Sequence, residues 1–242
     1  KSLIKKILSK FDLRLVKISK NENVNDVLKF LLSKLEIDVV FDVGANEGQF
    51  AKQLRNLGYK EKIISFEPLK KVFNLLGKNS SNDKKWQAMN IAIGDQDGET
   101  TINESNYSLS SSILPMSKLH LEAKENSNYI GKQKVSIKKI DTVIDSENLI
   151  KNNLFLKIDT QGFEYQVITG SIKNLKNIRA ILCELTLVEL YEGQKLWLDI
   201  VELLTANNFE IWSLEKGFQN SKNKQILQID GIFLNKEFKQ KL

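Results

Sequence analysis

The stretch that most constrains the fold of this chain is an apolar run that ends beside an acid and then breaks into a glycine turn. Residues 37–43 are rich in β-branched side chains, which predicts a strand buried on both faces, as in a parallel sheet. Asp42 lies at its carboxyl end, and Gly44 and Gly48 frame the turn that follows. Glycines allow backbone to approach a ligand closely, and a helix starting near Gly48 would direct its positive end at the same spot. We therefore expect a nucleotide-type site at the edge of an open α/β sheet.

Acidic residues recur at the ends of the expected strands. Four strands end with an acid at or next to their carboxyl edge: Asp42, Glu67, Asp159 and Glu184. Carboxylates brought together repel and raise one another's pKa, so stability alone does not explain this clustering. An acid at the end of the second strand accepts hydrogen bonds from ribose hydroxyls in nucleoside-binding sheets, which is the role we expect for Glu67. A solvated loop glutamate is the alternative interpretation.

A third strand is predicted over residues 86–93, before Gly94-Asp95. In nucleoside-binding sheets the end of the third strand borders the base. Ala92 and Ile93 would therefore line an adenine pocket, with simple core packing as the alternative.

Residues 95–133 interrupt the alternation of strands and helices and are interpreted as an insertion. Insertions beside the ligand edge of a sheet commonly form lids and substrate loops. Ser110 and Ser111 belong to a serine-rich run that offers hydroxyls to a polar substrate, although a flexible loop has the same composition. A histidine-dependent mechanism would rest on His120, the only histidine, and we do not favour one.

The carboxyl-terminal segment predicts the topology of the sheet. Residues 196–204 have the pattern of a helix, and strands are expected over residues 209–214 and 226–234. The loop between these strands is too short for a helical crossover, so they should form an antiparallel hairpin. We expect an α/β, Rossmann-like, seven-stranded sheet that is mostly parallel, has an antiparallel final strand and carries helices on both faces.

The distribution of charge argues against nucleic acid as a partner. The chain has 242 residues and a formal net charge of +6, and residues 1–20 contain the whole excess. The remaining chain is neutral and lacks the basic face that phosphate binding requires. A single cysteine favours a reducing cytoplasm, and the absence of any run of about 18 apolar residues predicts no membrane span.

The basic residues lie in an expected amphipathic helix over residues 2–18, where apolar side chains recur at helical spacing. With a second helix over residues 24–35, we expect a helical extension over residues 1–36 and the main domain over residues 37–242. The first helix would either rest on an anionic surface, such as the inner face of the membrane or an anionic polymer, or pack on the core. We favour packing, and the sequence leaves the oligomeric state open.

Four ordered motifs carry a resemblance to a known family. They occupy residues 41–50, 66–68, 90–94 and 156–164. These motifs resemble the successive motifs of the FkbM-type methyltransferases, and the resemblance covers roughly residues 37–234. The family is largely bacterial and is associated with O-methylation of sugars and other hydroxyl-bearing metabolites by S-adenosylmethionine. This chain departs from the family at Thr160-Gln161, where a β-branched residue and an acid are common.

The resemblance implies a role for each acid and for the glycine turn. The residues expected to hold S-adenosylmethionine are Asp42, Gly44, Ala45, Asn46 and Gly48 at its methionine end, Glu67 at its ribose, and Ala92 and Ile93 at its adenine. Asp159 is the preferred base or hydroxyl orienter, and Glu184 is the second choice. Glu164, with Ser110 and Ser111, is expected to contact the acceptor. Asp159 and Glu184 would also suit magnesium, which we do not take as the default.

The expected function is therefore that of an S-adenosylmethionine-dependent O-methyltransferase acting on a hydroxyl of a sugar or glycan-related metabolite. Two other classes remain open. An NAD-dependent oxidoreductase would also place Glu67 on ribose, but it favours a third glycine in the first turn, where this chain has Gln49 and Ala51. A non-catalytic glycan-binding module with a decayed cofactor site is the other alternative.

Overall fold

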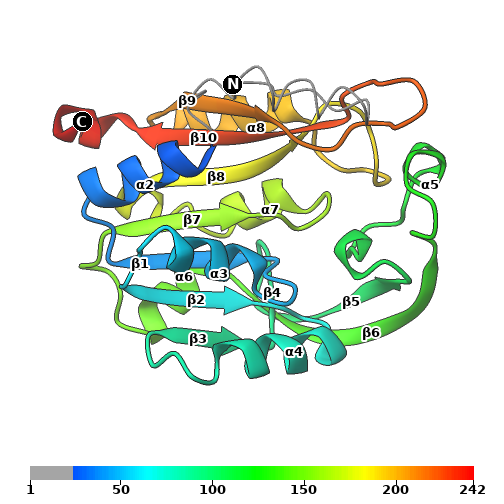
Figure 1. Cartoon of the computed structure of the whole chain (residues 1–242), viewed down its shortest axis with the longest axis horizontal. Helices are drawn as coiled ribbons and strands as arrows, with labels where there is room; N and C mark the ends of the chain where they lie inside the picture. The colour runs from blue at the N-terminus through cyan, green and yellow to red at the C-terminus, as the bar shows by residue number, and fades with distance from the viewer. Residues whose placement is uncertain (1–23) are drawn as a thin grey trace, which may run out of the picture.

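The computed structural model describes residues 24–242 as two sheets with helices on both faces of the larger one (Figure 1). The strands of the larger sheet are β1 (Val39–Val43), β2 (Lys62–Phe66), β3 (Trp86–Met89), β7 (Leu154–Ile158), β8 (Ile178–Thr186), β9 (Phe209–Lys216) and β10 (Gln228–Asn235). Their spatial order is β3-β2-β1-β7-β8-β10-β9. Neighbours are parallel except at β10, which runs antiparallel to β8 and β9. The expected Rossmann-like, seven-stranded, mostly parallel sheet and its closing hairpin are confirmed.

Helices cover both faces of this sheet because alternate strand residues face opposite sides. The helices of one face are α2 (Val24–Lys34), α3 (Gln49–Asn56) and α4 (Lys70–Ser80); those of the other are α6 (Ile140–Ser146), α7 (Glu164–Thr169) and α8 (Trp197–Ala206). In β1, Val40 packs against the face that carries α2 and α3, and Phe41 packs against the face that carries α6, α7 and α8. Two 3₁₀-helices, η2 (Leu175–Asn177) and η3 (Lys236–Lys241), complete the layers.

Of the two helices predicted in the amino-terminal segment, only the second lies within the described residues. The second expected helix is confirmed as α2, whereas the basic helix over residues 2–18 lies outside the described residues and stays a prediction, together with its membrane or polymer contact. Of the helices that the structure describes, none has the length and apolarity needed to cross a membrane.

The smaller sheet arises from the expected insertion and the residues beside it. It contains β4 (Ala92–Ile93), β5 (Gly98–Ser105) and β6 (Tyr129–Lys138) in the order β4-β6-β5, and η1 (Ser108–Ser110) and α5 (Lys118–Ala123) connect the last two strands. The predicted single strand over residues 86–93 is therefore wrong, because it is divided between two sheets. Asn90 lies at the division, and its Nδ2 donates to the backbone oxygens of Glu67 and Pro68 at 2.9 and 2.8 Å.

The turns after β1 and β7 are locked against each other. The backbone N–H of Asp159 donates to the Val43 carbonyl at 3.2 Å. Gly44 has a φ of 73°, and a Cβ at this position would lie 1.8 Å from the carbonyl oxygen of Asp159. Only glycine combines this backbone conformation with such a close approach. The sheet thereby brings the first glycine turn directly against the second acidic turn.

Replacing Gly44 by alanine should therefore cost more than the strain of a positive φ alone. We expect Gly44→Ala to lower the free energy of unfolding by at least about 3 kcal/mol, because the clash adds to that strain. Gly58→Ala is the matched control: Gly58 has a φ of 92°, and no atom lies within 4 Å of an added Cβ. It should cost only about 1–2 kcal/mol. Urea unfolding measures both losses, and equal values would contradict the role of the clash.

Candidate active site

A row of polar side chains crosses the apolar sheet near the carboxyl ends of β2, β1 and β7. Ser65, Asp42 and Lys157 are register partners on these three strands. Ser65 Oγ donates to Asp42 Oδ2 at 3.0 Å, and Lys157 Nζ lies 3.3 Å from Asp42 Oδ1. Asp42 is fully buried and lines none of the cavities described below. Asp42 was expected to contact the methionine end of a cofactor. In the structure it is instead paired with Lys157, and Lys157 lines the second cavity.

Lys157 is a candidate functional residue that the sequence analysis missed. Its ammonium donates to the carbonyl oxygens of Val43 and Gly44 at 3.3 and 3.1 Å, and it lies 3.6 Å from Asp159 Oδ2. Burial opposes the charged form, but Asp42 and Asp159 outweigh it, so the pKa of Lys157 is raised. The signal in the sequence is a lysine within an otherwise apolar strand, because a lysine is almost never fully buried unless it is paired.

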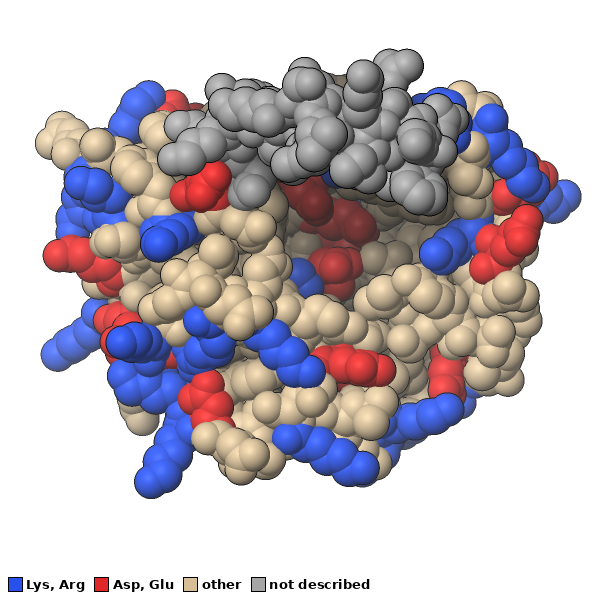
Figure 2. Space-filling model, viewed as in Figure 1, with Lys and Arg blue, Asp and Glu red and all other residues tan. Residues whose placement is uncertain are grey.

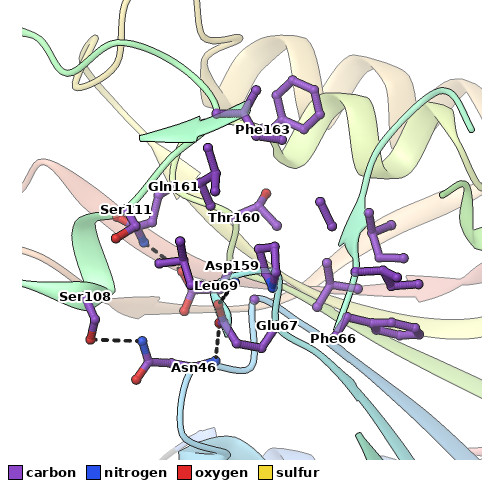
Figure 3. A pocket seen from close by; sticks show the side chains of 18 of the residues that line it. Asn46, Phe66, Glu67, Leu69, Ser108, Ser111, Asp159, Thr160, Gln161 and Phe163 are labelled. Atoms are coloured by element: carbon purple, nitrogen blue, oxygen red, sulfur yellow. Dashed lines mark hydrogen bonds between the residues drawn. The ribbon is translucent and has the colours of Figure 1, made fainter. Parts of the chain in front are cut away.

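The first cavity, of about 620 Å³, opens where the turns after β1, β2 and β7 meet (Figure 3). Seven of the residues predicted from the sequence line it: Gly44, Asn46, Glu67, Ala92, Ile93, Ser111 and Asp159. Gly48 does not line it, and lies at the amino end of α3 with a φ of 88°. The sheet therefore gathers most of the expected cofactor residues around one space.

Glu67 presents a fixed carboxylate to this cavity. Its Oε2 accepts a hydrogen bond from the backbone N–H of Asn46 at 3.0 Å, and its Oε1 accepts one from the N–H of Leu69 at 2.8 Å (Figure 3). Each oxygen keeps a second lone pair for a ligand hydroxyl. Burial raises the pKa of Glu67 to about 7, although the two backbone bonds oppose the rise.

The opposite wall of the cavity is apolar. Ala92 and Ile93 of β4 line it together with Ile102 and Phe163. Ala92 and Ile93 are also buried in the core of the molecule. Core packing and a place in the wall of an adenine pocket are therefore compatible roles for Ala92 and Ile93, because the same side chains pack in the core and face the cavity.

The second cavity, of about 880 Å³, lies on the side of the sheet that α2 and α3 cover. Ala45, Lys157 and three carboxylates, Asp159, Glu184 and Asp230, are part of its lining. Acidic side chains are visible in the depth of the hollow in Figure 2. Asp230 lies opposite Glu184 on β10, and its pKa is raised to about 6 by burial and then by Asp159. Asp230 was not predicted from the sequence, because it lies within an antiparallel strand and not at the carboxyl end of a parallel one.

Gln161 connects the two acids that were expected to be catalytic. Its Nε2 donates to Asp159 Oδ1 at 2.7 Å and to Glu184 Oε2 at 3.1 Å. Its Oε1 accepts a hydrogen bond from the hydroxyl of Tyr191 at 2.8 Å. The pKa of Glu184 is raised well above its usual range by burial and then by Asp159. At the position where the chain departs from the family, an amide thus holds two neighbouring carboxylates.

The other residues expected to contact the acceptor, Glu164, Ser110 and Ser111, do not line one common cavity. Glu164, which was expected to contact the acceptor, lines neither of the two cavities above nor the cavity that contains His120. Its carboxylate instead accepts hydrogen bonds from the backbone N–H groups of Thr160 and Gly162 at 2.8 and 3.0 Å, which fixes the turn after β7. Ser111 lines the first cavity, and Ser110, although largely buried, lines a further cavity beside Asp159.

The donor set does not fit a magnesium ion. Within residues 24–242, no group of three or more His, Cys, Asp or Glu side chains is arranged to hold a metal. The space beside Asp159 is instead occupied by two hydrogen-bond donors, the amide of Gln161 and the ammonium of Lys157. The ammonium is positively charged and the amide N–H carries a partial positive charge, so both disfavour a cation at this carboxylate.

Comparisons with known proteins agree with these features. The family model described as "Methyltransferase FkbM domain" matches residues 42–211. The 2-O-methyltransferase NoeI of Sinorhizobium fredii (strain NBRC 101917 / NGR234) is 29% identical over 175 residues, which cover 69% of this chain and 71% of that protein.

Solved methyltransferase structures are also similar, at low sequence identity. The precorrin-6y C5,15-methyltransferase from Geobacter metallireducens GS-15 has a TM-score of 0.45 and 12% identity, over 91% of both chains. A putative S-adenosylmethionine dependent methyltransferase from Listeria monocytogenes has a TM-score of 0.47 and 9% identity, over 86% of this chain and 96% of that one. Because the family model spans well over half of its length, the chain belongs to the FkbM family of class I S-adenosylmethionine-dependent methyltransferases.

Proposed function

We propose that this methyltransferase transfers a methyl group to a hydroxyl oxygen of a sugar or glycan-related metabolite. The observation that carries the proposal is the position of Asp159, which lines both the first and the second cavity. The relative at 29% identity is named a 2-O-methyltransferase, which supports oxygen as the acceptor atom. Neither the NAD-dependent oxidoreductase nor the non-catalytic glycan-binding module receives support from the family match.

The proposed cofactor position follows the lining of the two cavities. Glu67 would accept hydrogen bonds from the ribose hydroxyls, and Ala92, Ile93 and Phe163 would flank the adenine. The turn from Gly44 would approach the methionine end, which would extend into the second cavity. S-adenosylmethionine, when bound, supplies an electrophilic methyl group on a sulfonium that is a good leaving group.

Asp159 would align the acceptor hydroxyl and take up its proton. Gln161 holds one carboxylate oxygen at 2.7 Å, and Lys157 lies 3.6 Å from the other, so the group has a defined orientation. Remaining lone pairs on both oxygens are available to a hydroxyl. Glu184 is the second candidate to accept the proton. Alignment supplies most of the rate acceleration in this scheme, because a sulfonium leaves readily.

Asp159→Asn tests the proposed base. We expect methyl transfer to a panel of methyl hexopyranosides, followed as release of S-adenosylhomocysteine, to fall by about 100-fold or more. Affinity for S-adenosylmethionine should change by less than about threefold, because the substitution retains the hydrogen-bonding shape of the side chain. The matched control is Asp145→Asn on α6, where the aspartate pairs with Lys173 at the surface. Transfer that survives Asp159→Asn would contradict the role of this carboxylate.

Binding of S-adenosylmethionine should strengthen as the pH rises through 7. The ionised carboxylate of Glu67 accepts hydrogen bonds from ribose, and its pKa is about 7. If only this form binds, affinity at pH 8 should exceed affinity at pH 6 by about tenfold. Glu67→Gln should weaken binding and remove this dependence, whereas Glu61→Gln, which alters an exposed surface pair, should retain it.

Isothermal titration calorimetry at both pH values measures these affinities, with NAD as the competing ligand. Asp230 lines the second cavity and has a pKa of about 6, so Asp230→Asn measures how much this group, rather than Glu67, contributes to the pH profile. Absence of binding to S-adenosylmethionine, or tighter binding of NAD, would defeat the proposed function.

A further inference from the structure

A third cavity, of about 610 Å³, lies beside Asp159 and is not explained by the cofactor position proposed above. Tyr107, Ser110, His120 and Lys124, from η1, α5 and the residues next to them, line one part of it; Phe218 and Gln228, from the segment that closes the large sheet, line another. Asp159 and Leu109 line all three cavities, so the three spaces meet at this pair.

The polar part of the third cavity offers both donors and acceptors. It contains the carboxylates of Asp159 and Glu184 and the amides of Gln161 and Gln228. Gln228 Nε2 donates to Glu184 Oε2 at 2.6 Å, the same oxygen that accepts a hydrogen bond from Gln161. A hydroxyl both donates and accepts hydrogen bonds, so a mixed set of carboxylates and amides suits a ligand with several hydroxyls.

The remaining part of the lining is aromatic. Tyr107 is 39% exposed, and Phe218 is half-buried. The partly negative face of an aromatic ring attracts the C–H groups of a sugar ring, and ligand pockets commonly combine aromatic side chains with a few polar groups. Lys124 Nζ lies 4.2 Å from the centre of the Tyr107 ring, so its charge is already partnered.

His120 adds an uncharged polar group to the same cavity. It is 3% exposed, its Nε2 lies 3.2 Å from Ser110 Oγ, and its Nδ1 has no hydrogen-bond partner among the described residues. Burial lowers the pKa of His120 to about 4, with a smaller contribution from Lys124, so the ring is neutral near pH 7. A buried ring nitrogen without a partner needs an explanation, and a ligand hydroxyl in this cavity would supply the missing hydrogen bond.

We propose that the third cavity is the acceptor site and that it binds the pyranose ring of a sugar between Tyr107 and Phe218. The sugar hydroxyls lie over the carboxylate and amide floor, which brings one of them to Asp159. The second cavity is less suited to the acceptor, because it follows the glycine turn and contains the ammonium of Lys157. This inference rests on the proposed function, and it specifies the chemical class of the acceptor and the place where it binds.

Two matched substitutions distinguish the third cavity from the second. Phe218→Leu removes an aromatic face from the third cavity and Phe50→Leu removes one from the second, while both retain an apolar side chain. Methyl glucopyranoside, methyl mannopyranoside and methyl galactopyranoside are the probes, at saturating S-adenosylhomocysteine. Saturation-transfer difference NMR measures sugar binding, and calorimetry measures the affinity for S-adenosylhomocysteine.

We expect Phe218→Leu to weaken sugar binding by about three- to tenfold without changing the affinity for S-adenosylhomocysteine. Phe50→Leu should show the opposite pattern. Tyr107→Leu, at a more exposed position, should act like Phe218→Leu and serves as the test if the latter does not fold.

The outcomes separate this inference from the proposed function. If the wild-type protein binds S-adenosylhomocysteine but none of the three sugars, or if Phe218→Leu and Phe50→Leu weaken sugar binding equally, the acceptor site is overturned. The proposed acceptor site is also overturned if Phe50→Leu weakens sugar binding and Phe218→Leu does not. If the wild-type protein binds no S-adenosylhomocysteine, the proposed function itself fails.

Discussion

The buried ion pair between Asp42 and Lys157 is the interaction on which the architecture of this site depends. Two charges removed from water lose their solvation, and the loss is recovered only when the pair and its neighbours supply further hydrogen bonds. Ser65 donates to the aspartate, and the carbonyls of Val43 and Gly44 accept from the lysine. Removing one partner of such a pair typically costs about 3–5 kcal/mol, because the other charge remains buried and uncompensated.

The same ion pair connects the core to the chemistry at the edge of the sheet. Lys157 Nζ lies between Asp42 in the core and Asp159 at the cavities, at 3.3 and 3.6 Å from the two carboxylates. Gly44 brings the first turn against the backbone of Asp159. The position of Asp159 is thus set by backbone packing, a charge and the amide of Gln161. Three independent constraints of this kind favour a preorganised carboxylate, which is what alignment of an acceptor hydroxyl requires.

Much of the site could be predicted from local sequence, and the exceptions have identifiable causes. Glu67 and Asp159 line a cavity because each directly follows a parallel strand, and the carboxyl ends of such strands share one edge. Glu164 is instead the first residue of α7, and its carboxylate accepts hydrogen bonds from the turn that precedes this helix. Asp230 could not be predicted as part of the site, because the antiparallel hairpin alone brings it opposite Glu184.

Local patterns in the chain were sufficient to predict the seven-stranded sheet, its closing hairpin and the two acidic turns, because strand periodicity and glycine turns depend on near neighbours. Contacts distant in sequence decided the rest. The division of residues 86–93 between two sheets depends on Asn90 binding the backbone after β2. The meeting of three cavities at Asp159 and Leu109 depends on the folding of residues 95–133 over the sheet edge. Such contacts are long-range, and no local pattern encodes which segments will face each other across a cavity.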